Sequence, residues 1–188
     1  MSMSNLTLTT TLDSPIGPLT LTSAGGGLTG LHMQDQRRAP TARPEWRRDD
    51  DAFGEAIEQL TAYFAGSRTE FDLPLDLRGT EFQRRVWDGL RSIPHGQTWS
   101  YSELAEWTGN RNACRAVGLA NGANPISIVV PCHRVIGAGG SLTGYGGGLE
   151  RKRWLLDHER SATAPGLFPS NNAVALSPTT SGSSSAMK

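Results

Sequence analysis

Cysteine is scarce in this sequence. Only Cys114 and Cys132 occur among its 188 residues, 18 positions apart and in very different surroundings. Such a pair does not make the disulfide framework of a small secreted domain. The N-terminus lacks a basic stretch followed by an apolar core, and no apolar run approaches the roughly 20 residues that span a bilayer. These absences argue against a secreted or membrane protein and favour the reducing cytoplasm.

The sequence also lacks an excess of charge of either sign. Its 18 basic and 18 acidic residues give a net charge of zero, but the two signs are unevenly distributed. Residues 1–77 hold six arginines against eleven acidic residues, whereas residues 78–160 hold eleven basic against seven acidic residues. If the protein meets a polyanion, the second segment is the part that binds it. A solvated basic face is the alternative.

Residues 1–77 are predicted to form an N-terminal α/β domain, a small antiparallel sheet plus one helix. Apolar residues at helical spacing predict the helix over 53–64, with Asp50 or Asp51 as its N-cap. Residues 34–48, with two prolines and five arginines, predict an exposed loop. Alternating apolar residues predict strands over 5–12, 19–22, 28–33 and 70–77. Nothing in this part of the sequence indicates chemistry.

Residues 78–160 are predicted to form a mostly α-helical C-terminal domain. Capping-box spacings at 80–83 and 100–103 each begin a helix. After a glycine turn, Asn110 can cap a further helix that runs to about Asn121. Two short helices joined by such a turn are typical of a helix-turn-helix, although two packed structural helices would give much the same pattern.

The second helix of this pair has an unusual composition for a reader of the major groove. Ala113, Ala116, Gly118 and Ala120 are small, and Arg115 is its single long cation. Small residues let a backbone approach a surface closely, and one long side chain could then enter between bases, as in minor-groove proteins. The alternative is that the small residues merely pack against the neighbouring helix.

Residues 161–188 are rich in Ser, Thr, Ala, Pro and Asn and carry one charge. Such a composition buries too little apolar surface to offset the entropy of ordering, so a disordered tail is predicted.

The segment ISIVVPCHRVIG, residues 126–137, places Cys132 between a proline and a histidine. A thiolate attacks saturated carbon well, but a free thiol is mostly protonated near neutral pH, so another group must take its proton. His133 is adjacent, yet neighbours in an extended segment point to opposite sides, which favours a bridging water or a turn at this point. A carboxylate such as Glu159, at the end of the predicted helix 151–159, could orient the imidazole. A Cys-His dipeptide alone is usually accidental.

The wider context of this dipeptide is more specific. PCHRV at 131–135, ACRAVGLANGANP at 113–125 and GYGGGLERKRWLLDHE at 144–159 together resemble the O6-alkylguanine-DNA alkyltransferases. The resemblance covers 78–160 strongly and extends more loosely to the first domain through SPIGPL and LDLRGTEFQRRVW. It implies suicidal DNA repair, in which the alkyl group of O6-alkylguanine in double-stranded DNA moves to a cysteine of the protein after the nucleotide is flipped out.

The resemblance also implies a role for each matching residue. Cys132 matches the alkyl acceptor, His133 the base that works through a water, and Glu159 the carboxylate behind it. Tyr101 matches the tyrosine whose hydroxyl serves the leaving guanine, where negative charge develops as the carbon–oxygen bond breaks. Asn124 matches the asparagine that joins the DNA-binding helix to the active-site segment.

DNA contacts and a base pocket follow from the same resemblance. Arg115 is expected to fill the space of the flipped nucleotide. Further DNA contacts are expected at Ala116, Gly118, Ala120 and Asn121. The base pocket is expected at Val135, Tyr145, Gly146 and Gly147, with the backbone of Cys132 and Val135 reading the guanine edge.

No cofactor is expected. Some relatives bind zinc through cysteines of the first domain, but this sequence has none before Cys114, so no metal is predicted. No feature calls for an oligomer, and a monomer is expected. Two alternatives remain: a protein that recognises alkylated DNA without repairing it, and a Cys-His hydrolase. Relatives of the first kind lack the acceptor cysteine, and a hydrolase would need a regenerating step and leave the helix-turn-helix unexplained.

Overall fold

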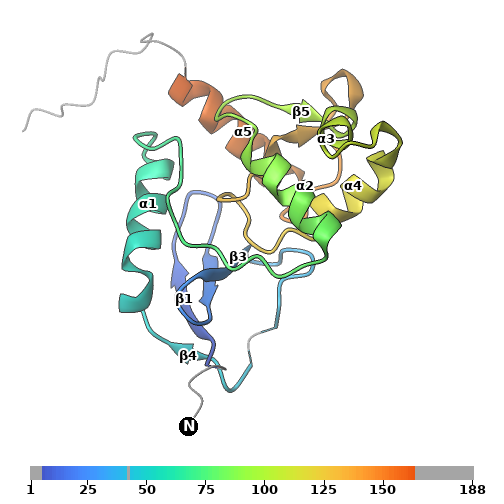
Figure 1. Cartoon of the computed structure of the whole chain (residues 1–188). Helices are drawn as coiled ribbons and strands as arrows, with labels where there is room; N and C mark the ends of the chain where they lie inside the picture. Colours follow the sequence, from blue (N-terminus) through green and yellow to red (C-terminus); the bar gives the residue numbers. More distant parts are fainter. Residues whose placement is uncertain (1–5, 42, 164–188) are drawn as a thin grey trace, which may run out of the picture.

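The structure, a computed structural model, describes residues 6–41 and 43–163. A small sheet with one helix along its side forms the N-terminal part, and the remaining helices gather in the C-terminal part (Figure 1). The strands are β1 (Leu8–Leu12), β2 (Leu19–Ser23), β3 (Leu28–Met33), β4 (Arg47–Arg48), β5 (Trp99–Ser100) and β6 (Val135–Ile136). The α-helices are α1 (Gly54–Phe64), α2 (Glu81–Arg91), α3 (Tyr101–Trp107), α4 (Cys114–Asn121) and α5 (Leu149–Thr163). Short 3₁₀ turns lie at Asp51–Phe53, Arg111–Ala113, Cys132–Arg134 and Ala138–Gly140.

The N-terminal sheet has the strand order β3-β2-β1-β4. β1, β2 and β3 pair antiparallel, as the alternation predicts. β4, which lies inside the predicted loop 34–48, pairs parallel to β1 and makes the sheet mixed rather than purely antiparallel. Its two residues are both exposed arginines, so no apolar alternation marks this strand in the sequence. Leu19, Leu21 and Leu31 carry the sheet's apolar face into the core.

The strand predicted over 70–77 is not formed. One isolated parallel bridge, between Leu28 and Leu75, is what joins this segment to β3. The Leu28 N–H donates to Pro74 O and the Asp76 N–H to Leu28 O, both at 2.8 Å. Proline has no N–H with which to extend a ladder, so the alternating segment runs alongside the sheet as an extended connection.

The helix predicted over 53–64 is present as α1, after a 3₁₀ turn. Neither predicted aspartate caps it: Asp50 makes no capping hydrogen bond and instead accepts from Thr10 Oγ1 at 2.6 Å. Asp49 Oδ1 accepts from the Ala52 N–H at 3.2 Å, so the residue one position earlier satisfies the free amide. α1 buries Ala56, Leu60 and Tyr63, among others, against the sheet and α5.

The helices of the C-terminal part begin where the capping boxes predict. Thr80 with Gln83 and Ser100 with Glu103 each form both reciprocal hydrogen bonds, at the starts of α2 and α3. Gly109, with φ +86°, makes the turn after α3. Asn110 Oδ1 accepts from the Asn112 N–H at 3.1 Å and caps the 3₁₀ turn that leads into α4. The two helices of the predicted helix-turn-helix are therefore confirmed.

The final helix, α5, continues to Thr163 and so passes the predicted start of the tail at 161. Ser161 Oγ donates back to Asp157 O at 2.8 Å within this last turn. The rest of the predicted tail, 164–188, lies outside the described residues. Within the described residues, no helix combines the length and apolar character needed to cross a membrane.

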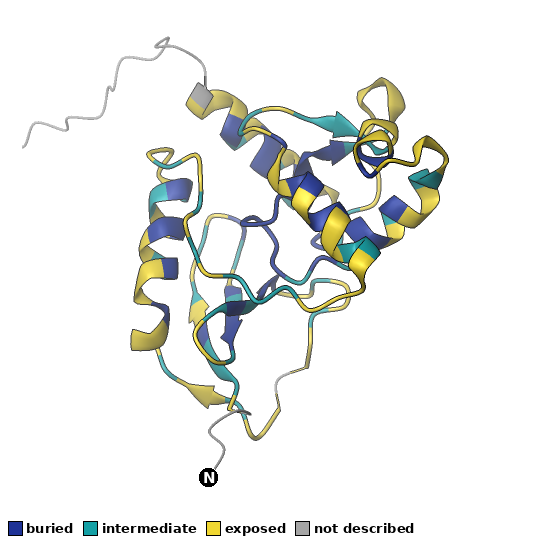
Figure 2. Ribbon diagram, in the orientation of Figure 1, coloured by how far each residue is buried: buried dark blue, intermediate teal, exposed yellow. Residues whose placement is uncertain are grey.

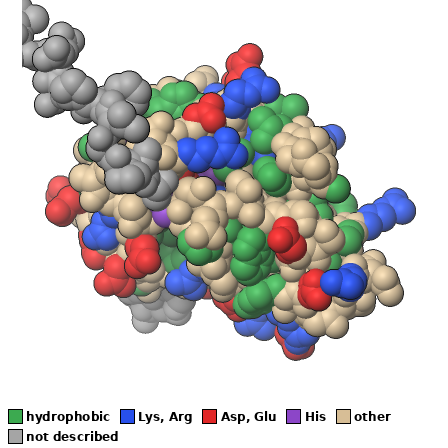
Figure 3. All heavy atoms as spheres, turned by 90° about the horizontal axis from the view of Figure 1, so that it is seen from above, with side chains coloured by type: hydrophobic (Ala, Val, Ile, Leu, Met, Phe, Trp, Pro, Cys, Tyr) green, Lys and Arg blue, Asp and Glu red, His purple; other side chains and the backbone are tan. Residues whose placement is uncertain are grey.

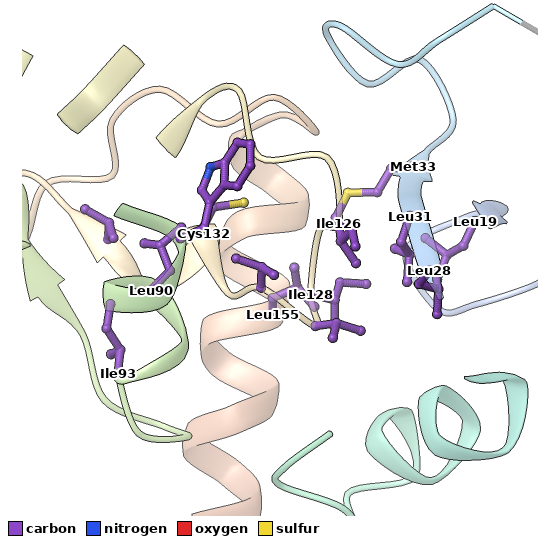
Figure 4. Packing of buried hydrophobic residues seen from close by; sticks show 14 of the residues in the cluster. Leu19, Leu28, Leu31, Met33, Leu90, Ile93, Ile126, Ile128, Cys132 and Leu155 are labelled. Carbon is purple, nitrogen blue, oxygen red and sulfur yellow. The ribbon is translucent and has the colours of Figure 1, made fainter. Parts of the chain in front are cut away.

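One core runs through both parts of the molecule. Leu31 N–H donates to Pro125 O at 2.9 Å and Ser127 N–H to Leu31 O at 3.0 Å, so β3 is bonded directly to the segment that leads to Cys132. Figure 4 shows Met33 and Leu31 of β3 facing Ile126 across this junction. Buried residues line the facing sides of the sheet, α1, α2 and α5 (Figure 2). The Cys132 segment is thus held from both sides.

Candidate active site and DNA-facing helix

The β-branched segment before Cys132 is folded into two tight turns. Ile128 has φ +71°, and the Val129 N–H donates to Ser127 O at 2.8 Å, which makes a γ-turn in a conformation that is strained for a β-branched residue. Pro131 has φ −82° and ψ 65°, and the Cys132 N–H donates to Val130 O at 2.8 Å, an inverse γ-turn. A 3₁₀ turn over Cys132–Arg134 follows. The sequence pattern allowed a turn at this point, and the chain makes one.

Asn124 holds this folded segment in place from within. Its Nδ2 donates to Val130 O at 2.8 Å, and its Oδ1 accepts from the Ile126 N–H at 3.0 Å. The side chain is buried and lies three residues after the end of α4. Asn124 therefore ties the end of α4 to the segment that carries the cysteine.

Cys132 is 6 % exposed and lies among the buried apolar side chains of α2, α5 and 126–128 (Figure 4). Burial raises the pKa of its thiol, against smaller opposing effects of hydrogen bonding to Asn124 and the charge of Lys152. A protein interior disfavours the thiolate in this way. The resting cysteine is consequently a neutral thiol that needs a proton acceptor.

His133 follows Cys132 in the 3₁₀ turn and is completely buried. Its Nε2 is 2.8 Å from Glu159 Oε1, while its Nδ1 is buried with no hydrogen-bond partner among the described residues. Burial lowers the pKa of His133, and the hydrogen bond and charge of Glu159 act in the opposite direction. At neutral pH the imidazole is therefore neutral and can accept a proton.

Glu159 is fully buried and surrounded by donors. Arg134 approaches it with two nitrogens, Nε at 2.8 Å from Oε2 and Nη2 at 2.9 Å from Oε1. Tyr63 OH donates to Oε1 at 2.9 Å and the Gly96 N–H to Oε2 at 3.1 Å. Burial alone raises the pKa of Glu159, but the hydrogen bonds and attraction of His133 and Arg134 hold it well below its usual range. The carboxylate is thus ionised.

A narrow pocket opens onto Cys132. Its inner part has a volume of about 10 Å³, roughly one water molecule, and is lined by Cys132, Asn121, Asn124, Ser127, Tyr145 and Gly147, among others. The outer cleft, of about 310 Å³, shares Tyr145 and Gly146 with it and adds Tyr101, Gly118 and Leu119. Burial raises the pKa of Tyr101, so its hydroxyl keeps its proton at neutral pH. A larger hollow of about 490 Å³ on another face has no cysteine in its lining.

The glycine loop over this pocket is held by the N-terminal part of the chain. The Arg37 N–H donates to Gly146 O at 2.8 Å. At Gly147 a Cβ would collide with Met33 Sδ, so a side chain there would push the loop off β3. Gly146 is less restricted, because its nearest neighbours leave ordinary contact distance for a Cβ. The Tyr145 hydroxyl is buried without a partner among the described residues.

The exposed side of α4 differs in part from the predicted DNA contacts. Arg115 and Ala116 are exposed, and Gly118 is half-buried against the Tyr101 ring. Ala120 and Asn121 are 3 % and 4 % exposed, and Ala120 O accepts from Trp87 Nε1 at 3.0 Å. These two residues therefore lie on the core side of α4 rather than on its exposed face. Asn121 instead lines the inner pocket.

The outward side of α4 also carries Leu119, which is 61 % exposed. Leu119 lies about one helical turn after Arg115 and Ala116, so helical spacing places all three residues on the same face of α4. The spacing was the signal for Leu119, and the small residues of this helix did not reveal it. In the view of Figure 3, charged side chains of both signs are scattered over the surface. The basic excess of the second segment does not gather into one large patch on that face.

Val135 is placed differently from the prediction. It is fully buried, its N–H donates to Cys132 O, and its carbonyl accepts from Lys152 Nζ at 2.6 Å. The Val135 N–H is thus already used within the protein, its carbonyl keeps a second lone pair, and Val135 lies outside the lining of the pocket.

Lys152 is a buried cation that the sequence analysis missed. Its Nζ donates to Val135 O and to Thr143 O, at 2.6 Å and 2.9 Å. Burial lowers the pKa of Lys152 to about 8, and the nearby Cys132 acts in the opposite direction. Arg134 was also missed, although it is part of PCHRV. The sequence did carry a signal for Arg134, because a charged residue among apolar neighbours in a short motif needs a charged or polar partner.

Known proteins agree with this architecture. The model of the 6-O-methylguanine DNA methyltransferase ribonuclease-like domain matches residues 7–77, and that of the DNA binding domain of the same family matches 81–161. The chain belongs to the 6-O-methylguanine DNA methyltransferase family.

Individual members of the family support this assignment along most of the chain. A methylated-DNA–protein-cysteine methyltransferase of Mycobacterium tuberculosis is 61 % identical over 151 residues, 80 % of this chain and 91 % of that protein. One from Methanosarcina acetivorans is 48 % identical over 149 residues, 79 % and 96 % of the two chains. The crystal structure of the M. tuberculosis OGT in complex with DNA superposes with a TM-score of 0.77 at 58 % identity, covering 84 % of this chain and 94 % of that one. The methyltransferase family resemblance inferred from the motifs is thereby confirmed.

Proposed function

We propose that this methyltransferase-family chain is a single-use DNA repair protein that transfers the alkyl group of O6-alkylguanine in double-stranded DNA to Cys132. The observation that supports this most directly is the arrangement at the pocket. Cys132, a neutral thiol, is followed directly in the same turn by His133, a neutral imidazole whose Nε2 rests on an ionised carboxylate. This is the arrangement of an activated nucleophile. A thioether is stable, so each protein reacts once.

The transfer can be written with its protons balanced. The Cys132 S–H bond breaks and its proton passes to His133 Nδ1, through a water. The sulfur then attacks the alkyl carbon, a sulfur–carbon bond forms, and the bond from carbon to guanine O6 breaks. The electron pair of that bond leaves with the guanine, which takes a proton from the Tyr101 hydroxyl. Glu159 stabilises the imidazolium that results. The phenolate is then reprotonated from water, and the imidazolium releases its proton to water, so both groups return to their neutral forms.

The base must leave the duplex to reach Cys132, because the O6 substituent lies inside the stack. We propose that Arg115 fills the space left behind, since it is the long exposed side chain at the start of α4. The inner pocket of about 10 Å³ is far too small for a guanine, so Tyr145 and the glycine loop have to move when the base enters. Phosphate contacts should make binding weaker at higher salt.

The finer features of this function remain proposals. We propose that the protein acts as a monomer in the cytoplasm, where the thiol stays reduced, on DNA with alkylated bases. The proposal extends to O4-alkylthymine as a second substrate. The two-domain division at residue 77 fits an arrangement in which 78–160 carries both DNA binding and chemistry. Recognition without repair is the alternative that Cys132 disfavours, and a hydrolase is disfavoured by the DNA-facing helix.

Intact-protein mass spectrometry after mixing with a duplex containing O6-methylguanine tests this function. We expect a mass gain of one methylene that saturates at one per protein. Cys132→Ala should show no gain, whereas Cys114→Ala, which removes the other thiol, should gain the same mass as the parent. Tight binding to the lesion without a gain would favour recognition alone. A product that keeps accumulating beyond one per protein would favour a hydrolase.

A further inference from the structure

Tyr63 connects the N-terminal part of the chain to the charged centre of the active site. It lies near the end of α1, is fully buried, and donates its hydroxyl to Glu159 Oε1 at 2.9 Å across 96 residues of sequence. That oxygen also faces His133 Nε2, at 2.8 Å. A side chain from the sheet-and-helix part therefore contacts the same carboxylate oxygen as the imidazole beside the reactive thiol.

Apart from the imidazole of His133, each group with a hydrogen bond to Glu159 described here is a donor. Oε1 accepts from Tyr63 OH and Arg134 Nη2, and Oε2 accepts from Arg134 Nε and the Gly96 N–H. Since arginine and a backbone amide only donate, Glu159 must present lone pairs to both. The His133 Nε2 that faces this carboxylate must then carry the proton, which leaves the lone pair on Nδ1. That is the nitrogen with no partner among the described residues.

We propose that Tyr63 is a positioning residue for alkyl transfer: its hydroxyl holds Glu159 and shares the charge of Oε1, so that His133 stays in the Nε2–H form with Nδ1 as the proton acceptor. This inference rests on the proposed function of Cys132 and His133. The N-terminal part, in which the sequence indicated no chemistry, thereby contributes to the site through one hydroxyl.

A purely structural role for Tyr63 is the competing explanation. Its ring packs against Phe64 and Phe71, with centroids 5.3 Å and 5.4 Å away, and against His158 at 5.3 Å. Phenylalanine at this position keeps these contacts and removes only the hydroxyl. Phe64→Leu, in contrast, disturbs the packing around Tyr63 but leaves its hydroxyl on Glu159. The two variants therefore separate the hydrogen bond from the packing.

The charges around His133 determine how Tyr63→Phe should change the reaction. Glu159 attracts the imidazolium, whereas Arg134 and Lys152 repel it, and His95 faces the same group from the connection before β5. Without the Tyr63 hydroxyl, more negative charge stays on Oε1, and the pKa of His133 rises. The neutral imidazole then requires a higher pH, so the acid side of the pH–rate profile shifts upward.

The test is the single-turnover rate of methyl transfer from duplex O6-methylguanine, measured from pH 5.5 to 9 for the parent protein, Tyr63→Phe and Phe64→Leu. On the acid limb of the profile Tyr63→Phe should be roughly three- to tenfold slower than the parent, a shift of about half to one pH unit, and the two rates should converge as the pH rises. Phe64→Leu should keep the parent profile. An unchanged profile in Tyr63→Phe, or an equal loss in both variants at every pH, would overturn the proposal.

A measurement on the parent protein makes the test independent of how well the variants fold. Nitrogen NMR of the His133 ring at neutral pH should report the proton on Nε2. A proton on Nδ1 would contradict the inferred role of Tyr63 and Glu159. If the parent protein itself failed to take up a methyl group, the proposed function would fall instead.

Discussion

Glu159 holds a full negative charge in the middle of the protein, and single residues explain how this is possible. Removing an ion from water costs several kcal/mol even after the protein relaxes. Arg134 compensates the charge with two hydrogen bonds, and Tyr63 and the Gly96 amide satisfy remaining lone pairs. The carboxylate thus stays ionised against the buried His133 imidazole. Stability and reactivity thus depend on the same few side chains.

Tyr101→Phe tests the proton donor at the leaving group. The phenol is half-buried at the mouth of the pocket, and its raised pKa keeps it protonated. Removing the hydroxyl should slow methyl transfer by about 10- to 100-fold. This loss reaches at most the lower end of the usual contribution of general acid catalysis, which is about 100-fold. Affinity for duplex DNA, measured by fluorescence anisotropy at fixed salt, should change little. A collapse of affinity would show that Tyr101 holds DNA rather than donating a proton.

Single residues also show where prediction from the sequence ends. Cys132, His133 and Glu159 were named from the sequence, and the structure buries all three and places His133 against Glu159. A motif match carries spatial information that composition lacks. Tyr63 and Lys152 were not named, since each meets the site through a contact that spacing along the chain does not reveal. Their roles, like those of the named residues, remain predictions.

At the scale of elements, the start of α3 determines where Tyr101 lies. Ser100 caps the helix and Tyr101 is its first residue, so the capping box sets the position of the phenol directly. β5, which contains Ser100, pairs in parallel with β6 and so joins this helix start to the segment after Cys132. The same local signal that begins a helix therefore aligns two parts of the site.

Two matched capping variants test this coupling. Ser100→Ala and Thr80→Ala each remove an N-cap side chain that accepts from the N3 amide at 3.2 Å, and each should lower the free energy of unfolding by about 1 kcal/mol. Only Ser100→Ala should also slow methyl transfer, because α2 carries none of the site residues proposed here. Chemical denaturation and single-turnover rates would measure both effects. Equal rates in the two variants would show that the cap of α3 does not position Tyr101.

Elements with local signals were predicted well, and those without were not. The fold class, the capped helices and the antiparallel strands are confirmed, because caps and alternation act over a few residues. β4 and the failure of the strand over 70–77 depend on pairing partners far along the chain. The γ-turn at Ile128 runs against the residue's own preference, and the packing and hydrogen bonds around it hold it there.

At the scale of the whole molecule, the two parts share one interior. β3 is bonded to 125–127, and Arg151 of α5 donates to Ile16 O at 2.9 Å and Gln34 O at 2.7 Å. With Tyr63 on Glu159, these contacts join the sheet to the reactive segment at several points. We infer that the described chain unfolds as one cooperative unit, which makes a single free energy of unfolding meaningful.

The pH dependence of that free energy follows from the buried groups. Burial lowers the pKa values of His32, His95 and His133. Above their unfolded pKa of about 6.5 these histidines are neutral in both states, but below it the unfolded chain binds protons first, so acid favours unfolding. Burial raises the pKa of Glu159, but its hydrogen bonds and the attraction of nearby positive charges lower it by more. The ionised Glu159 therefore adds stability above about pH 4.3, and this stability is lost on further acidification. Denaturation midpoints should therefore fall from pH 7 to pH 5 and fall again below about 4.3. His32→Gln, a change away from Cys132, should make the first decline shallower. A midpoint that rose between pH 7 and 5 would contradict the assignment of these histidines as neutral in the folded protein.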